Sequence, residues 1–159
     1  MKNFIKLLKL DLVPKVPLFL ALGGVIPFII LSCGIWFFSY EIKLIALYNL
    51  LNYSVIIITF IGAIYWGVAM LNNERMVMPY FISIMPSLIS WFMLMGFITN
   101  YLIILSCFIV IFAFIYFIDI KYTKRDFFPK WYMSLRKIVS FIVLLSLGFA
   151  SFGVNIHNL

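Results

Sequence analysis

Residues 119–137 read DIKYTKRDFFPKWYMSLRK, a cationic link between two apolar runs. The runs that flank it cover 101–118 and 138–154, and further out along the chain lie runs at 16–38, 44–71 and 78–97. A helix rises about 1.5 Å per residue, so about 20 apolar residues cross a hydrocarbon core of roughly 30 Å. The sequence therefore predicts an all-α membrane protein with five transmembrane helices.

The distribution of positive charge predicts the orientation of these five helices. If the chain crosses the membrane five times, eleven of its twelve Lys and Arg residues fall on one side, and only Lys43 falls on the other. Positively charged residues in short loops stay on the inner side of the membrane. We therefore expect the N-terminus inside and the C-terminus outside.

Composition agrees with a single transmembrane domain over residues 1–159. Hydrophobic residues make up 66% of the chain and charged residues 11%, unlike the balance of a soluble domain. The net charge of +7 flanks the apolar runs, which favours anionic lipid headgroups over nucleic acid as its partner. Residues 1–15 alternate Lys with apolar residues, which predicts an amphipathic segment on the inner surface; a frayed, charge-held tail is the alternative.

The link at 119–137 combines six cations with Phe127, Phe128, Trp131 and Tyr132, a mixture that suits the membrane interface. We expect a surface-parallel turn or short helix in which a helical turn begins at Pro129. A salt bridge between Asp119 and Arg136, exposed at this surface, would contribute at most about 1 kcal/mol. The predicted binding site for anionic lipid, cardiolipin included, consists of Lys121, Lys124, Arg125, Lys130, Trp131, Tyr132, Arg136 and Lys137. Alternatively, the link is only a topology signal, and Trp131 and Arg136 pack against protein.

Two stripes of small residues predict where helices pack closely. Small side chains at four-residue spacing let two helix backbones approach each other inside a membrane. The residues concerned are Thr59, Gly62, Ala63 and Gly67 in the second run, and Ser146 and Ala150 in the fifth. The link at 98–100 is short, so the third and fourth runs are expected to be antiparallel neighbours.

Several segments together resemble the domain-of-unknown-function family 3429. They are GVIPF at 24–28, FIGAIYWG at 60–67, PSLISW at 86–91, and Asp119 followed by FPKWYMSLR at 128–136. The positions that match the family's motifs are Tyr65, Trp66, Pro86, Trp91, Asp119 and Pro129. The resemblance implies a five-span inner-membrane protein, because the family includes proteobacterial inner-membrane proteins and the mitochondrial transmembrane protein 69. The family commonly has His before Trp-Gly, where this chain has Tyr65. From the residues alone, Tyr65 and Trp66 fit an aromatic belt near the inner end of the second run.

The sequence lacks the patterns expected of catalysis, so we predict no enzyme activity and no cofactor. Acidic residues sit at the ends of the runs or in links, and His157 is the sole histidine. We expect a structural or accessory subunit, or assembly partner, of a larger membrane complex, with other integral membrane proteins as partners. The expected location is a bacterial cytoplasmic or mitochondrial inner membrane. The alternative is a small channel or facilitator for an uncharged or lipid-like solute, lined by the hydroxyls of Ser83, Ser87, Ser90 and Thr59.

Overall fold

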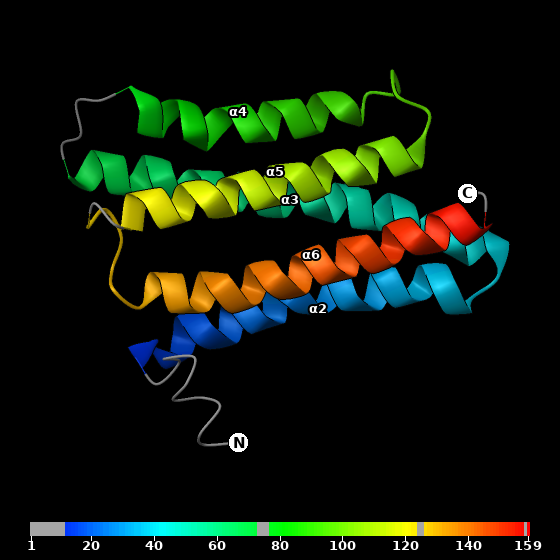
Figure 1. Ribbon diagram of the computed structural model, residues 1–159, viewed down its shortest axis with the longest axis horizontal. Coiled ribbons are helices and arrows are strands. Elements are labelled where there is room, and N and C mark those ends of the chain that lie inside the picture. Colours follow the sequence, from blue (N-terminus) through cyan, green and yellow to red (C-terminus); the bar gives the residue numbers. More distant parts are fainter. Residues whose placement is uncertain (1–11, 73–76, 124–125, 158) are drawn as a thin grey trace.

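The computed structural model describes residues 12–72, 77–123, 126–157 and 159, and these residues form five helices and no strand. The helices are α2 (Lys15–Phe37), α3 (Tyr40–Leu71), α4 (Met78–Met93), α5 (Tyr101–Thr123) and α6 (Tyr132–His157). Each helix runs antiparallel to the next one along the chain (Figure 1). Helices α2, α3, α5 and α6 are long and apolar enough to cross a membrane, whereas α4 has only 16 residues. The chain is therefore an all-α, multi-pass membrane protein, as the sequence predicts.

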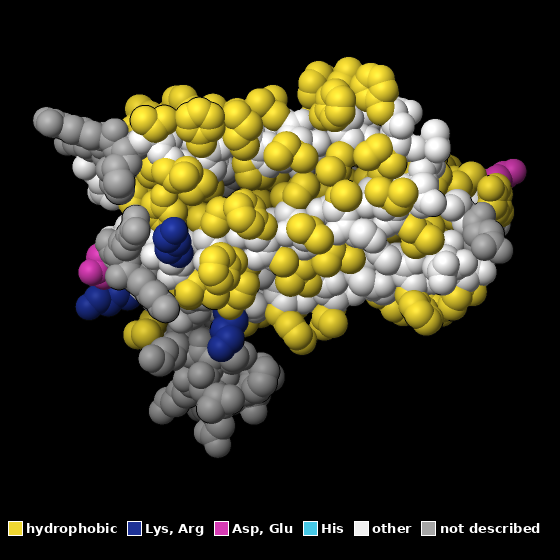
Figure 2. Space-filling model, turned by 45° about the horizontal axis from the view of Figure 1, so that its top comes forward, with side chains coloured by type: hydrophobic (Ala, Val, Ile, Leu, Met, Phe, Trp, Pro, Cys, Tyr) yellow, Lys and Arg dark blue, Asp and Glu magenta, His cyan; other side chains and the backbone are white. Residues whose placement is uncertain are grey.

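One end of the bundle, here called the basic end, holds the starts of α2, α4 and α6 and the ends of α3 and α5 (Figure 1). Among the Lys and Arg residues that the structure describes, Lys43 alone lies at the opposite end, in the first turn of α3. Figure 2 shows dark blue side chains gathered at the basic end. The residues described there are Lys15, Lys121, Lys130, Arg136 and Lys137. The predicted segment at 1–15 lies almost wholly outside the described residues.

The turn between α4 and α5 is longer than the sequence pattern indicates. The apolar run at 78–97 predicts a helix of that length, but α4 ends at Met93 and residues 94–97 form a turn. Gly96 has φ +89° in this turn, a conformation that only glycine adopts readily. Helix α5 then begins after Asn100, whose side-chain oxygen accepts bonds from the backbone N–H of Leu102 and Ile103. These bonds satisfy two of the unpaired donors at the helix start.

Helix α6 begins at Tyr132 instead of the predicted Ile138, and α5 extends to Thr123 instead of Ile118. The predicted interfacial link at 119–137 is therefore mostly helical, and only residues 124–131 connect the two helices. The expected turn at Pro129 is present, since its carbonyl accepts a bond from the backbone N–H of Tyr132. Residues 132–137 continue the helix because the charge of Arg136 is paired inside the bundle, so these residues do not have to stay at the surface.

Helix α4 packs on α3 and has little contact with α5, so its main neighbour is not the one that the short link predicts. The close approach is at Gly62, where a side-chain Cβ would overlap the backbone carbonyl of Ser83. Trp66 adds an edge-to-face contact with Tyr80, with ring centroids 5.2 Å apart. Of the first small-residue stripe, Gly62 is thus the residue at the contact between α3 and α4.

The rest of that stripe does not pack against the described residues of the chain. Thr59, Ala63 and Gly67 are exposed on the outer face of α3, and a Cβ at Gly67 would meet nothing within 4 Å. In the second stripe, Ser146 and Ala150 are buried where α6 packs on α2. At this seam the Ser32 hydroxyl of α2 donates a 2.8 Å hydrogen bond to the Ser146 carbonyl.

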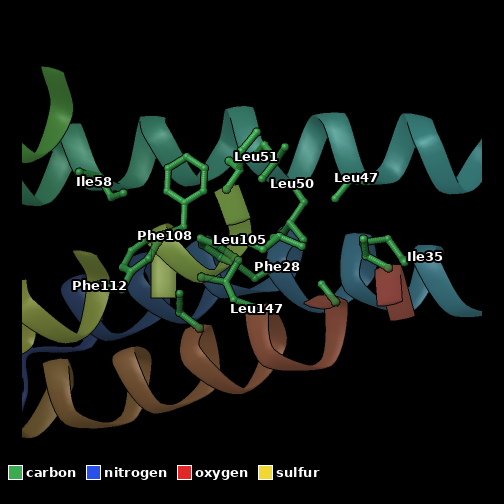
Figure 3. Close-up of a cluster of buried hydrophobic side chains, with 14 of the residues drawn as sticks. Phe28, Ile35, Leu47, Leu50, Leu51, Ile58, Leu105, Phe108, Phe112 and Leu147 are labelled. Carbon is green, nitrogen blue, oxygen red and sulfur yellow. The ribbon is translucent and has the colours of Figure 1, made fainter. Parts of the chain in front are cut away.

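The apolar core lies where α2, α3, α5 and α6 meet, near the middle of the bundle (Figure 3). Phe28 stands at its centre, edge-to-face with Tyr53 and Phe112 at centroid distances of 5.2 and 5.8 Å. The fully buried side chains around it include Ile35, Leu47, Leu50, Leu51, Ile58, Leu105, Phe108 and Leu147. Helix α3 packs on α4 and α2, and α6 packs on α2 and α5, so α2 is the helix that joins the pair α3 and α4 to the pair α5 and α6.

Candidate functional site

A buried polar cluster lies between three helices near the basic end, and it consists of Tyr65, Asp119, Tyr132 and Arg136. The Tyr65 hydroxyl of α3 donates a 2.6 Å bond to Oδ1 of Asp119 in α5. Arg136 of α6 donates from Nε to Oδ2 at 2.7 Å, and the Tyr132 hydroxyl donates to Oδ1 at 3.4 Å. One carboxylate therefore binds donors from α3 and α6, which ties both helices to α5.

The Asp119–Arg136 ion pair is buried, so the prediction of an exposed, weak pair was wrong. Asp119 is 0% exposed and the Arg136 side chain is 8% exposed. Asp119 also lies one turn inside the end of α5, instead of in a surface link. Two charges removed from water are costly unless they neutralise each other, and separating such a pair costs far more than separating a surface pair. The cluster is electrically neutral as a whole.

Aromatic side chains close the cluster off at the basic end. Phe128 stacks on Tyr132 with a centroid distance of 4.3 Å, and it also meets Tyr65 edge-to-face at 5.1 Å. Tyr122 and Phe127 pack around Tyr65 as well, at 5.6 and 6.2 Å. These rings keep the local environment apolar, which strengthens the electrostatic interactions inside.

The cluster leaves hydrogen-bonding capacity unused. Nη2 of Arg136 is buried and has no hydrogen-bond partner, because the contact with Asp119 is through Nε. The buried Ser140 hydroxyl, one turn further along α6, also lacks a partner. A buried donor without an acceptor is destabilising, so Nη2 of Arg136 is the donor of the cluster that still lacks an acceptor.

The residues predicted to bind lipid headgroups separate into three groups. Tyr132 and Arg136 point into the bundle and bond to Asp119, so they are not at the surface. Trp131 is half-buried beside them. Lys121, Lys130 and Lys137 are exposed at the basic end, while Lys124 and Arg125 lie outside the described residues.

The residues that match the family's motifs lie in different parts of the structure. Tyr65 and Asp119 are bonded to each other in the cluster, so Tyr65 is a core residue and not part of an aromatic belt. Trp66 and Trp91 are exposed, whereas Pro86 is buried in α4 where it faces α3. Pro129 lies exposed in the turn before α6. Among the described residues, no group of three or more His, Cys, Asp or Glu could hold a metal ion.

One feature of the sequence indicates this cluster. The interpretation of residues 119–137 as an interfacial link overlooked it. Asp119 follows an unbroken apolar run and lies four residues from the end of α5. An acidic residue inside a membrane helix requires a buried partner, and Arg136 was the nearest cation at a helix start. Tyr65 carries no comparable signal, because it is 54 residues away in the chain and only folding brings it to Asp119.

We expect Tyr65→Phe to lower the free energy of unfolding by about 1 kcal/mol, since hydrogen bonds between membrane helices typically have this value. The change removes one donor to Asp119 and keeps the ring that packs against Phe128. The measurement is unfolding in mixed micelles, followed by circular dichroism. Tyr48→Phe is the matched control, because Tyr48 is 68% exposed on the same helix. Equal stability of the two variants would show that the Tyr65 hydroxyl does not hold α3 to α5.

Comparison with known proteins places the chain in one family. The family model described as "Protein of unknown function (DUF3429)" matches residues 13–152, which include the whole cluster. Neither a curated protein nor a solved structure matches the chain.

Proposed function

The chain belongs to the DUF3429 family of proteins of unknown function, and from this premise we propose that it is a non-catalytic accessory subunit or assembly partner of a larger membrane complex. The observation that carries this proposal is the outward-facing stripe of Thr59, Ala63 and Gly67 on α3. A stripe of small residues is a helix-packing surface, and this fold leaves it unused. A helix of another membrane protein is the partner that such a surface accommodates.

In this proposal the protein crosses an inner membrane five times, with the basic end on the inner side. The charge distribution supports this orientation, because the described cations other than Lys43 lie at one end. Helix α4 is about 24 Å long at about 1.5 Å per residue, slightly less than the hydrocarbon core. Residues 94–97 continue its path to the opposite end of the bundle, where α5 begins (Figure 1). We place the protein in a bacterial cytoplasmic or mitochondrial inner membrane, with anionic lipid at Lys121, Lys130 and Lys137.

The alternative of a channel or facilitator has less support. Ser83 and Ser90 are buried against α3, and their hydroxyls donate to carbonyls of their own helix, those of Tyr80 and Pro86. Thr59 is exposed and bonds to the Val55 carbonyl. These three hydroxyls are bonded to their own backbone and do not line a polar path. The fourth, the buried hydroxyl of Ser87, has no hydrogen-bond partner. One unpaired hydroxyl does not make a continuous path, so the arrangement favours the accessory role.

The test of the accessory role is native electrophoresis with mass spectrometry after gentle solubilisation. We expect the wild-type protein to migrate in an assembly well above its own 18.6 kDa, and Gly67→Leu to shift it to the free form. The bulky side chain blocks the close approach of a partner helix at an exposed position, so the fold itself is unaffected. Gly148→Leu on α6 is the matched control, because a Cβ at Gly148 also meets nothing within 4 Å. Migration of the wild-type protein only as a free monomer would refute the proposal.

A further inference from the structure

A groove of about 460 Å³ lies between α2, α3 and α6 in the half of the bundle nearest the basic end. Helices α2 and α3 are joined at the far end and lie apart at the basic end, which opens the space between them (Figure 1). Apolar side chains line nearly all of it, among them Leu20, Phe28, Phe60, Ile64 and Val143. Leu20 and Phe60 are 72% and 66% exposed, so the groove opens sideways toward the hydrocarbon that surrounds a membrane protein.

The polar part of the groove is confined to the residues of α6 at the basic end. Tyr132 and Arg136 line it there, with Trp131 beside them. Arg136 is only 7% exposed, and its Nη2 has no hydrogen-bond partner. An apolar groove with one buried donor requires an elongated apolar ligand that has an acceptor oxygen at one end.

The charge of the buried cluster and the length of the groove indicate which ligand fits. Asp119 already neutralises Arg136, so an anionic head would leave an excess negative charge in a buried site, whereas a neutral carbonyl would not. Along α2 the groove lining extends from Pro17 to Phe28, about 16 Å at about 1.5 Å per residue. This length is close to half of a hydrocarbon core of roughly 30 Å, which is the depth that one acyl chain covers.

We propose that this groove binds one acyl chain of a membrane glycerolipid, with the ester carbonyl of that chain accepting a hydrogen bond from Nη2 of Arg136. The carbonyl lies at the junction of headgroup and hydrocarbon, as Arg136 does in the second turn of α6. Lys130 and Lys137, exposed at the basic end, are then on the headgroup side. This site is distinct from the outer face of α3 proposed to contact a partner protein, so either proposal can fail without the other.

The test compares two lipids on the purified full-length protein by native mass spectrometry in detergent. The lipids are a diacyl phosphatidylcholine and its dialkyl ether analogue, which have the same headgroup and chain length, but the analogue lacks the carbonyls. We expect one tightly retained diacyl lipid per chain and about tenfold weaker retention of the ether lipid, because the buried donor then loses its acceptor. Equal retention of the two lipids, or retention of neither, would overturn the proposal.

A pair of variants tests the location of the bound chain. Ala21 lines the groove, and Ala21→Phe fills it without altering the cluster around Asp119. Ala113 is exposed on α5 away from the groove, so Ala113→Phe adds the same side chain elsewhere. We expect Ala21→Phe to reduce retention of the diacyl lipid about tenfold and Ala113→Phe to leave it unchanged. An equal effect of both variants, or a retained molecule that is not a glycerolipid, contradicts this assignment. If Ala21→Phe does not fold, the comparison of ester and ether lipids on the wild-type protein still decides.

Discussion

Replacing Asp119 by Ala is expected to lower the free energy of unfolding by about 3–5 kcal/mol, the largest effect of any change considered for this chain. The carboxylate is 0% exposed, and it is the acceptor for Tyr65 and Tyr132 as well as the counter-ion of Arg136. Without it, a guanidinium that is almost fully buried has no compensating charge. The measurement is unfolding in mixed micelles, with circular dichroism as the readout.

A double variant tests whether the unpaired charge of Arg136 causes the loss of stability. Asp119→Leu combined with Arg136→Met removes both charges and keeps apolar volume in the site, which often restores stability. We therefore expect the double variant to be more stable than Asp119→Ala by most of the lost free energy. If Asp119→Ala alone is as stable as the wild type, the charge of Arg136 is not buried in the membrane-embedded protein. The interpretation of the cluster as a clamp between α3, α5 and α6 would then be wrong.

Gly62→Ala is expected to destabilise the protein by about 3 kcal/mol, the upper end of the range for overpacked sites. The added Cβ would overlap the Ser83 carbonyl, and a backbone atom within a helix cannot move aside as a flexible side chain does. The expected structural result is that α4 separates from α3 while the core of α2, α3, α5 and α6 persists. Limited proteolysis between α4 and α5 measures this separation, since a detached α4 makes residues 94–100 easier to cleave.

Gly67→Ala is the control for the same substitution on the same helix. Its Cβ meets nothing within 4 Å, so stability should stay within about 0.5 kcal/mol of the wild type. Equal effects at the two glycines would mean that helix propensity alone accounts for the change. In that case the close approach of α3 and α4 would not depend on Gly62.

The buried cluster shows one limit of prediction from the sequence. Asp119 and Arg136 were expected to pair, and they do, but their depth was misjudged because both lie at the edges of apolar runs. Hydropathy marks where a run ends and does not mark where a helix ends. Once the two charges neutralise each other, the helices extend through the polar residues, so α5 reaches Thr123 and α6 begins at Tyr132.

The small-residue stripes show a second limit. Spacing along α3 places Thr59, Ala63 and Gly67 on one face, but it does not indicate whether that face meets a helix of the same chain. Helix α4 packs on the face of α3 that holds Gly62, and this face is about a quarter of a turn from the stripe. The stripe of Ser146 and Ala150 lies on the buried face of α6, where α6 packs on α2.

The all-α membrane class and the segregation of the described cations to one end follow from the amino-acid sequence alone, because both depend on which residues tolerate hydrocarbon and which require water. Membership of the family also follows from the sequence. Three features depend on the folded chain: Tyr65 bonds to Asp119 from a distant helix, α4 packs on α3, and Arg136 lines a groove. The reason is that hydrophobicity is similar on all faces of α2, α3 and α5. Their pairing therefore depends on side-chain shape and on buried hydrogen bonds, which involve residues far apart in the chain.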